Sequence, residues 1–253
     1  MPRLDAHGVE LHYQTLGNGP DVVMLHGLIT GSLASWYYTL APLVASDHRV
    51  TLYDMRGHGL SQKTATGYDS ETLCRDLDAV VNQTCSDRFC LVGQSYGALV
   101  ALRYALKYPD RVSQLILVEL PLPPSQAGDL EALLDGGAES VLAALPQNGQ
   151  HLMGGGGRGR RFRRFCESIR FFADDSTLRH DLDVEPDIDE TALASLDVPT
   201  LAIYGDQSSC LPTLDRLAAH VTDLKTQTLN GGHYLHLDAL EPLSVAVRGF
   251  LNG

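Results

Sequence analysis

A serine between two glycines is the strongest chemical signal in the chain. Ser95 stands in Gly93-Gln94-Ser95-Tyr96-Gly97, directly after an apolar run and directly before a helical pattern. A Gly-x-Ser-x-Gly sequence in that setting predicts a tight strand-to-helix turn, because close backbone approach leaves room only for glycine at the flanking positions. Such a turn lifts the Ser95 hydroxyl above the carboxyl end of a sheet, so Ser95 is the candidate nucleophile.

A serine hydroxyl becomes a good nucleophile only beside a base, and a histidine near the end of the chain is the candidate. His233 follows Asn230-Gly231-Gly232, where the glycines let a loop carry the imidazole over the sheet. His236 lies near the start of the final helical pattern and is expected to be structural.

An earlier turn supplies the candidate oxyanion hole. Leu25-His26-Gly27-Leu28 ends an apolar run, and its free backbone N–H groups are available to a ligand. The expected donors to a developing oxyanion are the N–H groups of Leu28 and Tyr96. His26 is expected to hydrogen-bond its own loop, with substrate contact or proton transfer as its other candidate roles.

Elements that can position these residues alternate along the chain. Short runs rich in valine, isoleucine and leucine suit strands buried on both faces of a parallel sheet, and longer amphipathic stretches suit helices, so the alternation predicts an α/β fold. The expected strands are Val9–Gln14, Val22–His26, Val50–Asp54, Phe89–Gly93, Gln114–Glu119, Thr200–Tyr204 and Lys225–Leu229, and the expected helices are Ser35–Ala45, Ser70–Thr84, Tyr96–Tyr108, Thr213–His220 and Pro242–Leu251.

One interval interrupts this alternation. From Pro121 to Val198 there is no convincing strand, but two helical patterns occur, Asp129–Leu145 and Arg160–Phe172. The interval is too long for an ordinary loop, so it predicts an inserted helical lid. The expected division is a core of residues 1–119 and 199–253 and a lid of residues 120–198.

Charge is segregated within this lid. Six arginines come first and a run of acidic residues follows, which either neutralise one another or leave a basic patch for an acidic carrier protein or an anionic substrate tail. The arginines are Arg158, Arg160, Arg161, Arg163, Arg164 and Arg170.

Composition limits the other possibilities. The 253 residues carry a formal charge of −12, which disfavours binding to nucleic acid. No apolar run approaches the roughly 18–20 residues of a membrane span, and the first residues lack a signal-peptide layout, so a cytoplasmic protein is expected. The five cysteines form no Cys-x-x-Cys pair and are expected to be reduced and structural. No metal or organic cofactor is implied.

Taken together, these motifs resemble the α/β-hydrolase superfamily. The resemblance rests on Leu25-His26-Gly27, Asp54-Met55-Arg56-Gly57-His58-Gly59-Leu60-Ser61, Gly93-Gln94-Ser95-Tyr96-Gly97 and Gly231-Gly232-His233. It implies a mostly parallel sheet of about eight strands with helices on both faces, an inserted helical lid, and a triad in the order serine, acid, histidine. Ser95 argues against the dehalogenases and most epoxide hydrolases of the superfamily, because these use aspartate at that position.

The acid of the triad departs from the family pattern. The resemblance places it three residues beyond Gly205, but that residue is Ser208. Two carboxylates remain as candidates: Asp206 in the same loop, and Glu119 at the end of the preceding strand, where some dehalogenases and polyketide thioesterases of the superfamily carry the acid. Both strand ends open onto the same edge of the sheet, so either carboxylate could reach the imidazole.

These residues predict a hydrolase or acyl-transfer enzyme acting on a small-molecule carboxylic ester or thioester. Ser95 would attack the carbonyl, and His233 would accept its proton and later pass it to the leaving group. Trp36 and Tyr37 either line the substrate pocket or pack the first helix against the sheet.

Three other functions stay open. The same fold carries out C–C bond hydrolysis, lactone opening and cyclisation, and the absence of an acid at the usual position favours such a role in secondary metabolism. A catalytically silent ligand-binding protein is the second possibility. In the third, the arginine-rich lid docks an acyl carrier protein, and the chain is an editing or releasing thioesterase.

Overall fold

An eight-stranded sheet forms the centre of the molecule. The computed structural model describes residues 1–122, 140, 143 and 160–253. The strands are β1 (Arg3–Ala6), β2 (Val9–Leu16), β3 (Asp21–Leu25), β4 (Arg49–Tyr53), β5 (Phe89–Gln94), β6 (Val112–Val118), β7 (Thr200–Gly205) and β8 (Leu224–Leu229). Their order across the sheet is β1-β2-β4-β3-β5-β6-β7-β8, with β1 and β2 antiparallel to their neighbours and the other pairs parallel.

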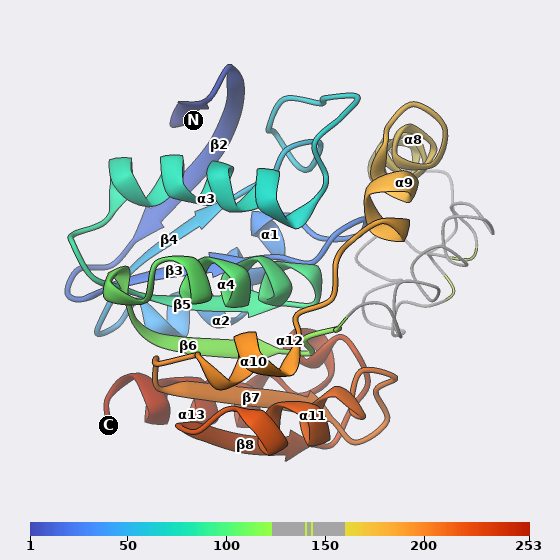
Figure 1. Ribbon diagram of the computed structural model, residues 1–253. Helices are drawn as coiled ribbons and strands as arrows, with labels where there is room; N and C mark the ends of the chain where they lie inside the picture. The colour runs from blue at the N-terminus through green and yellow to red at the C-terminus, as the bar shows by residue number, and fades with distance from the viewer. Residues whose placement is uncertain (123–139, 141–142, 144–159) are drawn as a thin grey trace.

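Helices cover both faces of this sheet (Figure 1). The helices are α1 (Leu33–Tyr37), α2 (Leu40–Val44), α3 (Ser70–Thr84), α4 (Tyr96–Lys107), η1 (Pro109–Arg111), α8 (Arg160–Asp174), α9 (Leu178–Asp183), α10 (Glu190–Ala194), α11 (Thr213–His220), α12 (Leu235–Asp238) and α13 (Leu240–Leu251). One apolar cluster joins the sheet to α3 and α4, and a second joins the opposite face to α1, α2 and α13. The predicted α/β fold with a mostly parallel sheet is confirmed.

The first predicted helix is interrupted. The sequence pattern runs from Ser35 to Ala45, but the structure forms two short helices, α1 and α2, with a break at Tyr38 and Thr39. Pro42 explains the break, because proline has no N–H to bond the carbonyl four residues earlier and its ring clashes with that carbonyl.

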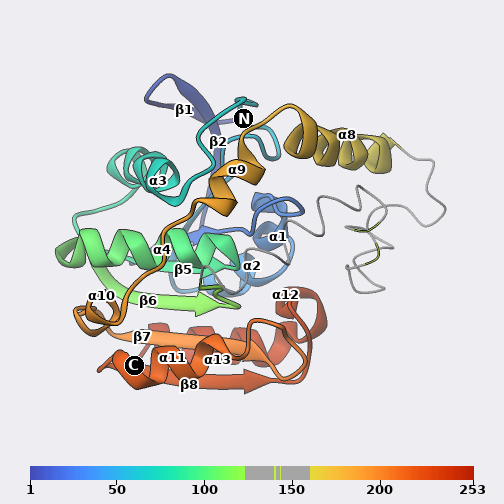
Figure 2. The ribbon, with the colours of Figure 1, turned by 45° about the vertical axis from the view of Figure 1, so that its right-hand side comes forward.

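The carboxyl ends of the parallel strands define the edge where the site lies. The arrowheads of β6 and β8 point toward the side of the molecule that carries α8 and α12 (Figure 2). Between β6 and β7 the described residues form the helices α8, α9 and α10. The pattern Arg160–Phe172 therefore corresponds to α8, whereas the pattern Asp129–Leu145 lies mostly outside the described residues. The lid boundaries stay a prediction.

None of the helices in the described part of the chain combines the length and apolar character needed to cross a membrane.

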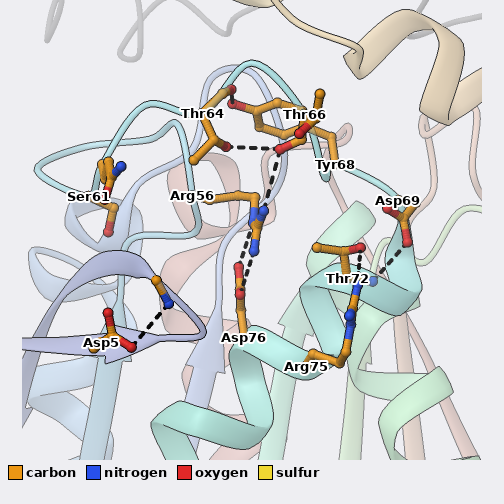
Figure 3. Close-up of polar contacts among 12 residues, drawn as sticks. Asp5, Arg56, Ser61, Thr64, Thr66, Tyr68, Asp69, Thr72, Arg75 and Asp76 are labelled. Atoms are coloured by element: carbon orange, nitrogen blue, oxygen red, sulfur yellow. Dashed lines mark hydrogen bonds and ion pairs between the residues drawn. The ribbon is translucent and has the colours of Figure 1, made fainter.

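The segment from Asp54 to Ser61 ties the loops above the sheet to the helices. Arg56 donates two hydrogen bonds of 2.7 Å to the Asp76 carboxylate on α3, in a buried ion pair (Figure 3). Asp54 accepts hydrogen bonds from the backbone N–H groups of Leu33 and Leu60, and Ser61 donates to the Asp54 carbonyl. The Asp54 carboxylate is thus occupied by structural contacts.

Candidate active site

Ser95 occupies a strained turn between β5 and α4. Its backbone has φ 54° and ψ −128°, in the region that residues other than glycine rarely adopt. A Cβ at Gly93 would lie 2.4 Å from the Gly97 carbonyl oxygen, and a Cβ at Gly97 would lie 2.4 Å from the His26 carbonyl oxygen. Both positions therefore require glycine, as the Gly-x-Ser-x-Gly spacing predicted. Strain held by surrounding packing is common at functional sites.

The loop after β8 brings His233 to this turn. The side chain of Gln94, which precedes Ser95, donates from Nε2 to the His233 carbonyl at 3.3 Å. The His233 side chain is 28% exposed, so one part of the ring faces solvent while another contacts the protein. That protein contact is an acid: Nδ1 of His233 lies 3.1 Å from Oε2 of Glu119. The second ring nitrogen, Nε2, is the candidate atom to accept a proton.

Glu119 is fully buried just beyond the end of β6 and is held from several sides. Its φ of 57° is itself unusual for a non-glycine residue. The Gly205 backbone N–H donates to Oε1, and the Ser208 hydroxyl donates to Oε2. Ser208, which stands where the resemblance to the superfamily places the acid, therefore orients Glu119.

Asp206 is not brought to the imidazole. Its exposed carboxylate accepts hydrogen bonds from the Gly231 backbone N–H at 3.0 Å and from the Asn230 amide at 3.3 Å. Asp206 thus fastens the loop that carries His233, and one backbone N–H and one side-chain amide of that loop donate to its two oxygens. The interpretation of Asp206 as the imidazole's partner disagrees with this geometry.

A cysteine, which sequence reasoning treated as structural, also contacts the imidazole. The thiol of Cys210 lies 3.6 Å from His233 Nδ1, and Cys210 is 5% exposed. Burial by itself lowers the pKa of the His233 imidazole, but its interactions with Cys210 and Glu119 outweigh burial and raise the pKa above its ordinary value. Two neighbours therefore favour positive charge on this ring, which is the charge it gains when it accepts a proton.

The predicted oxyanion loop lies against Ser95. A Cβ at Gly27 would be 3.1 Å from the Ser95 Cβ, so the loop that carries Leu28 packs closely against the turn that holds Ser95. Tyr96 is the first residue of α4, where helix N–H groups have no partner within the helix. The N–H groups of Leu28 and Tyr96 are thus positioned as candidate donors to an oxyanion.

Two buried histidines hold this loop in place. Nε2 of His58 accepts a hydrogen bond from the Ile29 N–H at 3.0 Å, and Nε2 of His26 accepts one from the Met55 N–H at 3.0 Å. Both rings are neutral, because an imidazolium has no lone pair to accept with. Burial lowers the pKa of His26, and burial together with His26 lowers the pKa of His58 to about 3.

Three residues that were expected to contact the substrate, His26, Trp36 and Tyr37, are engaged in other contacts. His26 is fully buried and both ring nitrogens are engaged, Nδ1 by the Gly27 carbonyl and Nε2 by the Met55 N–H, so it is not available to bind substrate. Trp36 is also fully buried, and its indole N–H donates to the Leu25 carbonyl at 3.0 Å. It packs α1 against the sheet, and the half-buried Tyr37 packs against the same apolar cluster.

The neutral state of His58 predicts a loss of stability in acid. Its folded pKa of about 3 lies below the unfolded value of 6.5, so the unfolded chain binds more protons between these values. The unfolding free energy should be largest above pH 6.5 and fall toward pH 4 by about 1.4 kcal/mol per pH unit for such a histidine. Urea unfolding at pH 7.5, 6 and 5 measures it. His58→Gln keeps an acceptor for Ile29 and does not titrate, so it should flatten the profile; an unchanged profile contradicts this assignment.

Glu185 is a buried residue that the sequence showed only as one member of the acidic run. Its carboxylate accepts hydrogen bonds from the Ser70 N–H at 3.0 Å and the Tyr96 hydroxyl at 2.7 Å, and forms an ion pair with Arg103 at 2.9 Å. Tyr96 follows Ser95, so Glu185 links the segment after α9 to the helix that begins at the candidate nucleophile. Only the folded structure reveals this, because the partners come from distant segments.

Removing the Glu185 carboxylate should lower the stability of the fold. Glu185→Ala leaves Arg103, whose Nε already has no partner among the described residues, without its counter-ion. We expect the unfolding free energy to fall by about 3 kcal/mol, measured by urea denaturation. Glu190→Ala is the matched control, because the Glu190 carboxylate is 73% exposed and should change stability by less than about 0.5 kcal/mol. Equal effects of the two substitutions would contradict the proposed role of Glu185.

The chain is similar to a family model and to several known proteins. A family model described as "alpha/beta hydrolase fold" matches residues 20–150. The chain is 27% identical to the "Putative non-heme chloroperoxidase" of Synechocystis sp. over 93% of each chain. It is 32% identical to the 2-(acetamidomethylene)succinate hydrolase of Mesorhizobium japonicum over 54% of this chain and 49% of that protein. The solved thioesterase domain from the curacin biosynthetic pathway has a TM-score of 0.71 and 25% identity, with 96% of each chain covered.

Proposed function

The chain belongs to the alpha/beta hydrolase fold family, and from that premise we propose that it is a serine hydrolase that cleaves a carboxylic ester or thioester. Curated relatives that are hydrolases support the general class. The ester or thioester bond is inferred from the site, because a serine, a histidine and an acid beside two free N–H groups suit acyl transfer.

In the proposed mechanism Ser95 attacks the acyl carbonyl while Nε2 of His233 accepts its proton. Glu119 keeps the other ring nitrogen protonated and stabilises the imidazolium that forms. The N–H groups of Leu28 and Tyr96 stabilise the negative oxygen of the tetrahedral intermediate. His233 then returns the proton to the leaving group, and water releases the acyl group from Ser95.

The observation that carries this proposal is the contact of 3.1 Å between Glu119 and His233 beside the turn that holds Ser95. Glu119 is fully buried, so a carboxylate at this place needs a partner of opposite or developing positive charge. The imidazolium formed during acyl transfer supplies such a charge.

A burst experiment tests the proposal. Para-nitrophenyl acetate and butyrate should give a rapid release of nitrophenol equal to the enzyme concentration, followed by slower turnover. A serine-directed fluorophosphonate should add one label, and peptide mapping should place it on Ser95. A folded protein with neither burst nor label would overturn the proposal and favour a cyclase or a ligand-binding protein of the same fold.

A second candidate substrate is a thioester carried by an acyl carrier protein. Arg163, Arg164 and Arg170 are exposed on α8, where they could meet an acidic surface. Acidic side chains that follow them are engaged elsewhere: Asp181 accepts from the Tyr68 N–H at 2.9 Å, and Asp187 pairs with Arg216. The likeness to the curacin thioesterase domain points to the same substrate class.

Salt dependence separates the two substrates. Turnover of a carrier-bound acyl group should weaken steeply with salt and fall in the variant Arg163→Ala/Arg164→Ala, while turnover of para-nitrophenyl acetate should be unchanged. Arg248→Ala, which removes a partly exposed arginine from α13, is the matched control. Salt-independent turnover that survives the double substitution would exclude carrier docking on α8.

A further inference from the structure

Three side chains with metal-binding atoms meet at Nδ1 of the His233 imidazole. One ligand atom each from Glu119, Cys210 and His233 lies within 4.8 Å of the others. Nδ1 of His233 is 3.6 Å from the Cys210 sulfur and 3.1 Å from Oε2 of Glu119. A base that needs only an orienting carboxylate has no use for a thiol here, so Cys210 calls for a separate explanation.

The sulfur–nitrogen separation fits a tetrahedral metal ion. Metal–sulfur and metal–nitrogen bonds of about 2.3 and 2.1 Å at a tetrahedral angle place the sulfur and nitrogen about 3.6 Å apart. We propose that Glu119, Cys210 and His233 bind Zn²⁺, or Cd²⁺ as its softer analogue, and that the bound ion switches off the hydrolase. The binding site stands on this geometry, whereas the inhibition rests on the proposed function.

The ligand atoms are held before any ion arrives. Ser208 donates to the Glu119 carboxylate, and the Cys210 backbone N–H donates to the Ser208 hydroxyl at 3.1 Å. Gly205 fixes the other oxygen of Glu119. Hydrogen bonds of this kind orient the ligands of metal sites and raise their affinity. The His233 side chain is 28% exposed, which gives an ion a way in and leaves a fourth position for water.

Binding would block the base by changing its tautomer. The Cys210 S–H bond breaks, a sulfur–metal bond forms and the thiol proton leaves to solvent. The metal replaces the proton on Nδ1 of His233, and that proton leaves to solvent, while Nε2 carries a proton in the metal-bound state, so the metal-bound ring is neutral. Nε2 then has no lone pair to accept the Ser95 proton. Glu119 binds the metal ion and no longer orients His233 through Nδ1. No electron transfer is involved.

Direct metal binding is measured first. Cd²⁺ titrated into the full-length protein should give the ultraviolet charge-transfer absorbance of a cadmium–thiolate bond, with one ion bound. Cys210→Ser should lose this band and bind at least about a hundredfold more weakly. Cys85→Ser, which removes a half-buried thiol away from the site, should behave like the wild type. A band that is absent, or that survives in Cys210→Ser, would overturn the metal site.

Inhibition is measured separately. Zn²⁺ should suppress para-nitrophenyl acetate turnover in the wild type, EDTA should restore it, and Cys210→Ser should need at least about tenfold more Zn²⁺ for the same fractional loss. Ser95→Ala should bind Cd²⁺ as tightly as the wild type. Binding by an enzyme that never hydrolyses esters would refute the proposed function alone, while full activity in the metal-bound protein would refute the inhibition.

Discussion

Replacing Ser95 by alanine is expected to abolish the burst and to lower kcat for para-nitrophenyl esters by about 10⁵- to 10⁶-fold. The hydroxyl oxygen forms the bond to the acyl group, and the described neighbours of the turn offer no second nucleophile in the same position. Residual turnover would come from the oxyanion donors and from substrate binding alone. Stopped-flow release of nitrophenol measures both the burst and the steady rate.

The same substitution should leave the fold intact, which separates chemistry from stability. Ser95 precedes α4 but its side chain makes no capping hydrogen bond, and alanine keeps the Cβ that the turn already accommodates. The control is Ser61→Ala, because the Ser61 hydroxyl donates to the Asp54 carbonyl at 2.6 Å and accepts from the His12 N–H. That control should lose about 1–2 kcal/mol of stability and retain the burst. A Ser95→Ala enzyme within tenfold of wild type would refute the nucleophile.

The candidate nucleophile and the candidate base could be chosen from sequence because their signals are local. Gly93 and Gly97 stand beside Ser95, and the two glycines before His233 mark a loop, so short segments already contain the geometry. The strand order and the two helical faces follow from apolar periodicity in the same way. The break at Tyr38 and Thr39 shows the limit of periodicity, since the missing N–H of Pro42 divides a helix that the apolar pattern predicts to be continuous.

The acid was not predictable in this way. Glu119 and His233 are 114 residues apart, and the choice between Glu119 and Asp206 depends on which carboxylate turns toward the ring. Backbone conformation and backbone hydrogen bonding determine which carboxylate turns toward the ring. Glu119 has a positive φ, whereas Asp206 is engaged by the Gly231 N–H. Cys210 was missed for the same reason, because nothing near it in the sequence indicates a contact with an imidazole.

Changing each carboxylate to its amide should therefore separate the two candidates. Glu119→Gln is expected to lower kcat by about 10³- to 10⁴-fold, because the amide no longer enforces the correct tautomer of His233 or stabilises its imidazolium. Asp206→Asn should lose less than about tenfold, since its amide oxygen still accepts from the loop that carries the histidine. Steady-state kinetics on para-nitrophenyl butyrate, with circular dichroism to verify folding, measure both. The reverse ranking would move the triad to Asp206.

Ser208 offers a sharper form of the same test. Its hydroxyl already contacts the Glu119 carboxylate, so an aspartate at this position would place its oxygens close to where those of Glu119 now lie. In the inactive Glu119→Ala background, Ser208→Asp should recover at least about tenfold in kcat, because the shorter residue puts a carboxylate back within reach of Nδ1 of His233. Ser208→Asn in that background is isosteric but uncharged and should recover much less. Equal recovery by both would mean that filling the space beside His233 matters more than supplying a carboxylate, and the assignment of Glu119 as the triad acid would then fail.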